Sequence, residues 1–84
     1  MFLLLVACAT TPTGDATAGA TVFANTCAVC HGADGTGGSG PDITGEANSP
    51  ELSDTILNGT GDMPAQDLTD TEVADVIAYM KATF

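Results

Sequence analysis

Cys27-Ala28-Val29-Cys30-His31 is the stretch around which this chain of 84 residues is organised. Two thiols separated by two residues and followed directly by an imidazole form the pattern of covalent c-type haem attachment. The spacing lets both sulfurs form thioethers to the two vinyl groups on one edge of a porphyrin. The histidine then comes under the macrocycle and can offer a neutral imidazole nitrogen to the iron. The stretch therefore predicts one covalently bound haem c, held by Cys27 and Cys30 and ligated by His31.

Other uses of a Cys-x-x-Cys pair fit this chain less well. A thioredoxin-type redox pair belongs in a βαβ context, and the sequence shows no strand pattern. A structural zinc site needs four ligands, whereas the motif supplies three and His31 is the single histidine. The fourth ligand would have to be Cys8 or a carboxylate. A disulfide between Cys27 and Cys30 would constrain very little.

Length and composition describe one small domain with a thin core. A chain this short buries too little apolar surface to be stably folded without a covalent cross-link, a metal or a cofactor. It contains no Trp, one Tyr and three Phe. A haem would supply the large apolar surface that these side chains lack.

The charge is strongly acidic. The sequence has eleven carboxylates and a single cationic residue, Lys81, which gives a formal net charge of −10. Such a surface repels phosphate backbones, so we expect no nucleic-acid binding. It suits redox proteins that present a basic docking face. The carboxylates are dispersed along the chain, which favours a solvated surface over an acidic tail.

Residues 1–8 have the layout of a signal segment that ends in a lipobox. An apolar run leads to Leu5-Val6-Ala7-Cys8, which resembles the bacterial pattern in which the cysteine becomes the lipid-modified first residue. We expect lipidation at Cys8; the alternative is a free thiol in a frayed terminus. The run is too short to span a bilayer as a helix. Residues 9–14 predict a flexible linker, so the domain proper covers residues 15–84.

The segment 15–26 is predicted to form the first helix. Asp15 can cap its N-terminus, and one face carries Gly19, Val22, Phe23 and Thr26. Gly19 lies one turn before Phe23 and would let another backbone approach closely beside the aromatic ring.

A second helix is predicted to begin with Ser49 as N-cap and Pro50 in the first helical position, and to end at Asn58-Gly59. Its inward-facing positions are Leu52, Ile56 and Leu57.

The last helix covers about residues 70–83, with a capping box formed by Thr69 and Glu72. Its apolar stripe consists of Val73, Val76, Ile77, Met80 and Phe84. The predicted fold class is therefore all-α, with about three short helices and glycine-rich loops wrapped around one haem.

The segment 32–45 contains six glycines in fourteen residues and cannot form a regular element. A flexible linker is one interpretation. We favour a loop that runs flat along a haem edge, where side chains would obstruct it, with Pro41 and Ile43 in contact with the ring.

Met63 is the candidate for the second axial position of the iron. A second histidine cannot be this ligand, because His31 is the single histidine of the sequence. Met63 lies in a loop beside Pro64, whose ring stiffens the backbone. Met1 belongs to the leader, and Met80 lies on the apolar stripe of the last helix. We expect thioether ligation by Met63; in the alternative, the site stays open to a small gas or a peroxide.

With these residues in place, the chain resembles a class I c-type cytochrome of the small bacterial single-haem kind over residues 15–84. The resemblance rests on the attachment motif, the Gly19/Phe23 helix, the final helix with Tyr79, and two loop stretches. Those stretches are Gly40-Pro41-Asp42-Ile43-Thr44-Gly45, which is similar to the family's GPxLxG, and Met63-Pro64.

The resemblance implies the cytochrome c fold and two specific contacts. The first and last helices would cross with Gly19 and Phe23 against Val76 and Tyr79. The Pro41 carbonyl would accept a hydrogen bond from the second nitrogen of His31, which fixes the tautomer. The resemblance also implies a periplasmic or cell-surface location, where a lipidated Cys8 would tether the domain to a membrane.

The expected function is one-electron transfer, not catalysis. Ligation by His31 and Met63 gives an iron that changes little between its two oxidation states, and the soft thioether raises the potential. No residue is left over as an evident acid, base or nucleophile near the iron. We expect the domain to act as a monomer.

Overall fold

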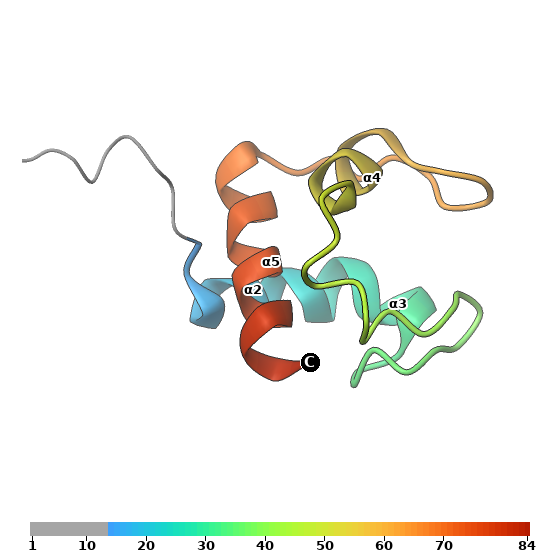
Figure 1. Cartoon of the computed structure of the whole chain (residues 1–84), viewed down its shortest axis with the longest axis horizontal. Helices are drawn as coiled ribbons and strands as arrows, with labels where there is room; N and C mark the ends of the chain where they lie inside the picture. Colours follow the sequence, from blue (N-terminus) through green and yellow to red (C-terminus); the bar gives the residue numbers. More distant parts are fainter. Residues whose placement is uncertain (1–13) are drawn as a thin grey trace, which may run out of the picture.

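The structure is a computed structural model that describes residues 14–84. Its elements are α2 (Ala16–Val22), the π-helical turn η1 (Phe23–Cys27), α3 (Ala28–His31), α4 (Leu52–Asn58) and α5 (Asp70–Thr83). Figure 1 shows their arrangement, with long loops on both sides of α4. Within residues 14–84 there is no strand, and the β-type pairing is one isolated bridge between Thr60 and Met63. The predicted all-α class is confirmed.

The first helical stretch begins where its sequence predicts and ends later. The Asp15 carboxylate accepts hydrogen bonds from the backbone amides of Thr17 (2.9 Å) and Ala18 (3.3 Å), which makes it the N-cap. The stretch does not stop at residue 26. It continues through η1 and α3 to His31, so the attachment motif is part of the same helical stretch.

Helix α5 has the predicted capping box. The Thr69 hydroxyl accepts from the Glu72 amide at 3.1 Å, and the Glu72 carboxylate accepts from the Thr69 amide at 2.9 Å. Two of the free amides at the helix start are thereby satisfied. Its predicted stripe points inward: Val73, Val76 and Met80 are buried, and Ile77 and Phe84 pack against them.

Helix α4 begins later than the sequence predicts, and Ser49 is not its side-chain cap. The Ser49 hydroxyl donates to the Glu51 carboxylate at 2.9 Å, so it caps no backbone amide. The Ser49 carbonyl accepts from the Leu52 amide at 3.2 Å, which closes a tight turn through Pro50 before the first α-helical bond forms. The prediction for the end of the helix is confirmed: Gly59 follows it with φ 81°.

Helices α2 and α5 cross at Gly19. A methyl group added there would lie 1.9 Å from the Asp75 carbonyl oxygen and 2.9 Å from Cβ of Tyr79, so only glycine lets the backbones approach this closely. The Asp75 carboxylate also accepts a hydrogen bond from the Asp15 amide at 2.8 Å. The crossing implied by the resemblance is confirmed, and the backbone of Asp75 makes the nearest contact.

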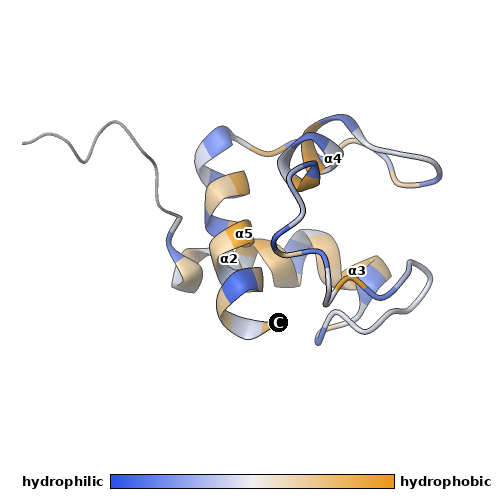
Figure 2. Ribbon diagram, in the orientation of Figure 1, coloured by the Kyte–Doolittle hydropathy of each residue, from blue (hydrophilic) through white to orange (hydrophobic). Residues whose placement is uncertain are grey.

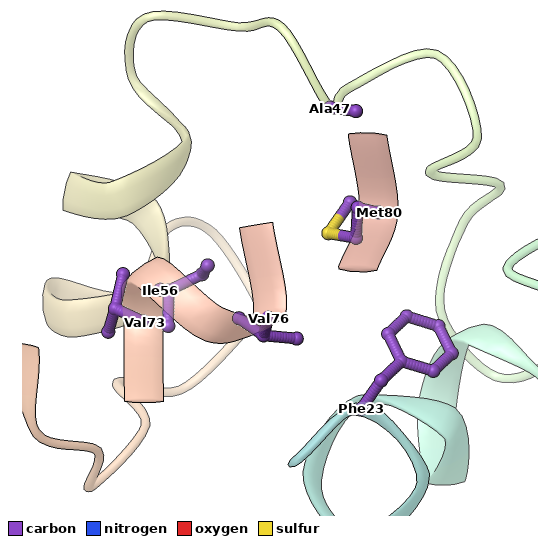
Figure 3. Packing of buried hydrophobic residues seen from close by; sticks show 6 residues of the cluster. All are labelled: Phe23, Ala47, Ile56, Val73, Val76 and Met80. Carbon is purple, nitrogen blue, oxygen red and sulfur yellow. The ribbon is translucent and has the colours of Figure 1, made fainter. Parts of the chain in front are cut away.

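The core lies between these helices and α4. Its buried side chains are Phe23, Ala47, Ile56, Val73, Val76 and Met80, which Figure 3 shows as one cluster. Hydrophobic colouring concentrates on the helices in Figure 2, whereas the loops are mostly pale or hydrophilic. No helix in the part of the chain that the structure describes is long and apolar enough to cross a membrane.

An aromatic cluster joins the core to the glycine-rich loop. The ring centroid of Phe84 lies 5.5 Å from that of Phe23 and 6.0 Å from that of Tyr79, in edge-to-face arrangements. Gly35, which is buried with φ 75°, packs under the Phe84 ring: a methyl group there would come within 2.8 Å of it. The loop is therefore fixed against the helices and is not a flexible linker.

Candidate functional site

The attachment motif presents its three reactive side chains in different environments. His31 is 9% exposed, Cys27 is half-buried and Cys30 is exposed. Both thiols are free. Burial raises the pKa of the Cys27 thiol above its usual value, because desolvation disfavours the thiolate. Val29, between them, is 79% exposed, so this end of the helical stretch reaches the protein surface.

The imidazole of His31 is oriented by the backbone of the glycine-rich loop. Its Nδ1 lies 2.8 Å from the carbonyl oxygen of Pro41, which confirms the predicted hydrogen bond. Since a carbonyl only accepts, Nδ1 carries the proton and Nε2 has the free lone pair. His31 lines a cleft, and no side-chain nitrogen or oxygen among residues 14–84 is both buried and without a partner.

Glycines bring the loop close enough to make this bond. The amide of Gly37 donates to the His31 carbonyl at 2.8 Å, and that of Gly40 donates to the Cys30 carbonyl at 2.7 Å. These two carbonyls end a helix and need such partners. A methyl group on Gly40 would lie 3.0 Å from Cε1 of His31 and 3.3 Å from Cβ of Cys30. The loop thus packs directly on the motif.

Two cavities adjoin this face of the protein, with volumes of about 470 and 540 Å³. They share six lining residues, so we treat them as two parts of one cleft. The shared residues are Cys27, His31, Pro41, Ile56, Asp62 and Met63. Ile43 and Leu52 extend the wall of the larger part, which is mainly apolar. Pro41 and Ile43 therefore lie where the sequence predicts contact with a ring.

Met63 reaches the cleft from a tight loop. Its amide and carbonyl pair with those of Thr60 at 2.8 and 3.0 Å, and the Gln66 amide donates to the Ile56 carbonyl at 2.8 Å. These bonds fasten both sides of the loop. The Met63 side chain is half-buried and lines both parts of the cleft. Met80 is 2% exposed in the core, and it borders only the larger part of the cleft.

The residues that line the cleft fit a haem. Two free thiols, one oriented imidazole and one thioether border a largely apolar space, and these are the groups that a c-type haem uses. Among residues 14–84, no group of three or more His, Cys, Asp or Glu side chains is placed to hold a metal ion. Cys8, the predicted lipidation site, lies outside the described residues.

Two features of the site escaped the sequence interpretation. One is the π turn at Phe23–Cys27, which ends at the first cysteine of the motif. The other is a set of three carboxylates on the cleft: Asp62 borders both parts, and Asp42 and Glu46 border the larger one. The carboxylates reach the cleft because their loops fold back in space. No local pattern in the sequence marks either these carboxylates or the π turn.

The fold is similar to that of two solved cytochromes cL. The one from Hyphomicrobium denitrificans has a TM-score of 0.69 and 26% identity, over 83% of this chain and 50% of that chain. The one from Methylophaga aminisulfidivorans has a TM-score of 0.70 and 28% identity, over 80% of this chain and 51% of that chain. The chain therefore spans about half the length of these two proteins.

Sequence comparison gives the same relationship. A cytochrome c-553-like protein from Synechocystis is 33% identical over 72 residues, which is 81% of this chain and 69% of that protein. Residues 14–80 match the family described as cytochrome c oxidase, cbb3-type, subunit III. The chain belongs to the cytochrome c family, whose members are electron-transfer proteins with one covalently attached haem c.

Proposed function

We propose that this chain is a one-electron carrier whose haem is attached through Cys27 and Cys30 and ligated by His31 and Met63. When bound, the haem supplies reversible one-electron oxidation and reduction of its iron. The observation that carries the proposal is the shared cleft: the buried imidazole and the loop thioether both line its two parts. The side chains and backbone of the protein hold the haem, orient its ligands and tune its reduction potential.

His31 and its partner hold one ligand in place. The hydrogen bond from Nδ1 to the Pro41 carbonyl fixes the tautomer, so Nε2 is the nitrogen free to bind iron. Such a bond also makes the ligand nitrogen more basic and limits rotation of the ring. A ligand that does not move between oxidation states keeps electron transfer fast.

Met63 and the cleft carboxylates act on the reduction potential in opposite directions. A neutral, soft thioether favours the reduced iron and raises the potential. Asp42, Glu46 and Asp62 border the cleft, and their negative charge favours the oxidised iron. All three carboxylate residues are exposed to solvent, where water and salt weaken their effect. We therefore assign the larger influence to Met63.

The exposed end of the motif is the proposed place for electron exchange. Val29 and Cys30 are exposed there, and the net charge of −10 favours a redox partner with a basic face. Homologues in this family are typically extracytoplasmic, so we propose a periplasmic or cell-surface location. A lipid at Cys8 would tether the domain there. We assign the protein no catalytic activity and expect it to act as a monomer.

A spectroelectrochemical titration of the purified full-length holoprotein tests this function. We expect one reversible one-electron transition, with low-spin spectra in both oxidation states. A high-spin reduced form, or turnover of added peroxide at a rate typical of an enzyme, would overturn the carrier proposal. The partner proposal has its own test, because the rate of reduction by a basic redox protein should fall with rising salt concentration.

A further inference from the structure

The helical stretch that carries the motif contains one extra residue in a single turn. The Phe23 amide donates to the Gly19 carbonyl four residues earlier, which is the α-helical spacing, and also to the Ala20 carbonyl. The Ala28 amide then donates to the Phe23 carbonyl, five residues earlier. Four-residue spacing returns with the bond from the Gly32 amide to the Ala28 carbonyl, at 2.9 Å. Such π turns are rare and occur often at functional sites.

The extra residue changes which side chains share a face. In an unbroken α-helix each residue advances by about 100°, so Cys30 would lie about 20° and His31 about 80° from the direction of Phe23. When one residue is absorbed by the turn, His31 moves to about 20° and Cys30 to about 120° from Phe23. The π turn therefore places His31, and not Cys30, on the same face of the helix as Phe23.

Burial in the structure follows the second pattern. Phe23 is 1% exposed and His31 is 9% exposed. Cys30 is exposed, and Val29, one residue earlier, is 79% exposed. An unbroken α-helix would direct Cys30 into the core and turn His31 away from the Pro41 carbonyl to which it is bonded at 2.8 Å.

We propose that the π turn sets the direction in which the motif's side chains point around the helix axis. In this proposal the number of residues between Phe23 and Cys27, and not their identity, positions His31. The same helical face must serve two purposes: Gly19 and Phe23 pair with α5, and His31 must meet the cleft. Ala24 and Asn25 supply the length and are both exposed. They are positioning residues, and the proposal rests on His31 as the haem ligand.

Deletion and substitution within the turn separate residue number from residue identity. The deletions remove Ala24 or Asn25 from the full-length protein, and the matched controls are Asn25→Ala and Asn25→Leu, which replace a weak helix former with stronger ones. Each holoprotein is examined for covalent haem after denaturation, for its low-spin spectrum and for its midpoint potential. The Tyr79 signal in near-ultraviolet circular dichroism reports the pairing with Phe23, whose ring centroid lies 5.3 Å away.

We expect both deletions to attach haem, to retain the Tyr79 signal and to lose the low-spin spectrum. Both substitutions should keep the wild-type spectrum and potential. Deletions with a wild-type spectrum would overturn the proposal. The substitutions test it even if the deleted chains do not fold, because a changed spectrum in Asn25→Leu would show that residue identity positions His31. If the proposed carrier function is wrong, the wild-type protein itself will lack the low-spin spectrum. If only the proposal on the π turn is wrong, the wild-type spectrum will be low-spin and the deletions will share it.

Discussion

Nδ1 of His31 donates a hydrogen bond to the carbonyl oxygen of Pro41 across 2.8 Å. The bond joins the end of α3 to a loop ten residues further along the chain. It leaves Nε2 as the one ring nitrogen free for a metal. Because the acceptor is a backbone atom, its position depends on how closely the glycines beside it pack against the motif.

Gly40→Ala tests that packing. The added methyl group would lie 3.0 Å from Cε1 and 3.1 Å from Nδ1 of the His31 ring, so the ring or the loop must move. We expect a loss of about 1–3 kcal/mol in the free energy of unfolding, typical of overpacking, together with a changed midpoint potential. The control is Gly45→Ala, where nothing lies within 4 Å of the added methyl group. Equal effects of the two substitutions would contradict this role of Gly40.

Gly19→Ala tests the pairing of α2 with α5. On an isolated helix the change should stabilise by up to about 1 kcal/mol. Here the methyl group would come within 1.9 Å of the Asp75 carbonyl oxygen, so we expect a net loss of about 2 kcal/mol or more. Chemical denaturation measures it. The matched control, Ala18→Gly at the exposed neighbouring position, should cost about 1 kcal/mol through helix propensity alone. A stabilised Gly19→Ala protein would refute the close crossing.

Phe84 tests the aromatic cluster. Truncation of a fully buried Phe costs about 3–5 kcal/mol; Phe84 is half-buried, so we expect about 1–3 kcal/mol for Phe84→Ala. Phe84→Leu keeps an apolar side chain but loses the edge-to-face contacts with Phe23 and Tyr79, and should cost about 1 kcal/mol. Thermal unfolding of the two variants distinguishes them. If neither substitution lowers the midpoint temperature of unfolding, the aromatic cluster does not hold the loop.

Much of this local structure follows from side-chain chemistry that the sequence displays. Asp15 and the Thr69/Glu72 pair satisfy free amides within three residues of themselves, so neighbouring residues alone decide whether these caps form. The buried stripe of α5 likewise follows from helical spacing. The bond between His31 and Pro41 is longer in range, and the resemblance to a known family implied it.

The remaining features differ in origin: the missing cap at Ser49 comes from a competing local bond, whereas the π turn and the place of Asp62 depend on contacts that no local pattern contains. Ser49 has the identity of an N-cap, but its hydroxyl bonds to the Glu51 carboxylate instead, and helix α4 starts later. The π turn arises because two ends of one helical stretch must face α5 and the cleft together. Asp62 borders the cleft only because the loop of residues 60–63 folds back.

Two exposed carboxylates predict a dependence of stability on pH. The Thr36 hydroxyl (2.7 Å) and then its amide (3.3 Å) donate to Asp34 and lower the pKa of that carboxyl. Thr44 lowers the pKa of Asp42 in the same way, against a smaller opposing effect of the Asp34 charge. A pKa depressed in the folded state gives stability above the unfolded value, about 3.9, and this stability is lost as pH falls through the folded value.

We therefore expect the wild-type protein to lose more stability between about pH 5 and pH 3 than a double variant in which Asp34→Asn and Asp42→Asn remove both titrations. Unfolding free energies of the two proteins across this range provide the measurement. The dispersed carboxylates common to both proteins contribute equally and cancel in the difference. Parallel curves would show that the two threonine contacts do not form in solution.

Carbon monoxide binding to the ferrous holoprotein tests the central claim most directly, because it asks whether Met63 occupies the sixth position of the iron. We predict no rapid binding to the wild-type protein or to Met80→Leu, a volume-conserving change in the core that should cost less than about 1.5 kcal/mol. Met63→Ala should bind carbon monoxide rapidly, one molecule per haem. Rapid stoichiometric binding to the wild-type protein would contradict the account and identify an open haem site.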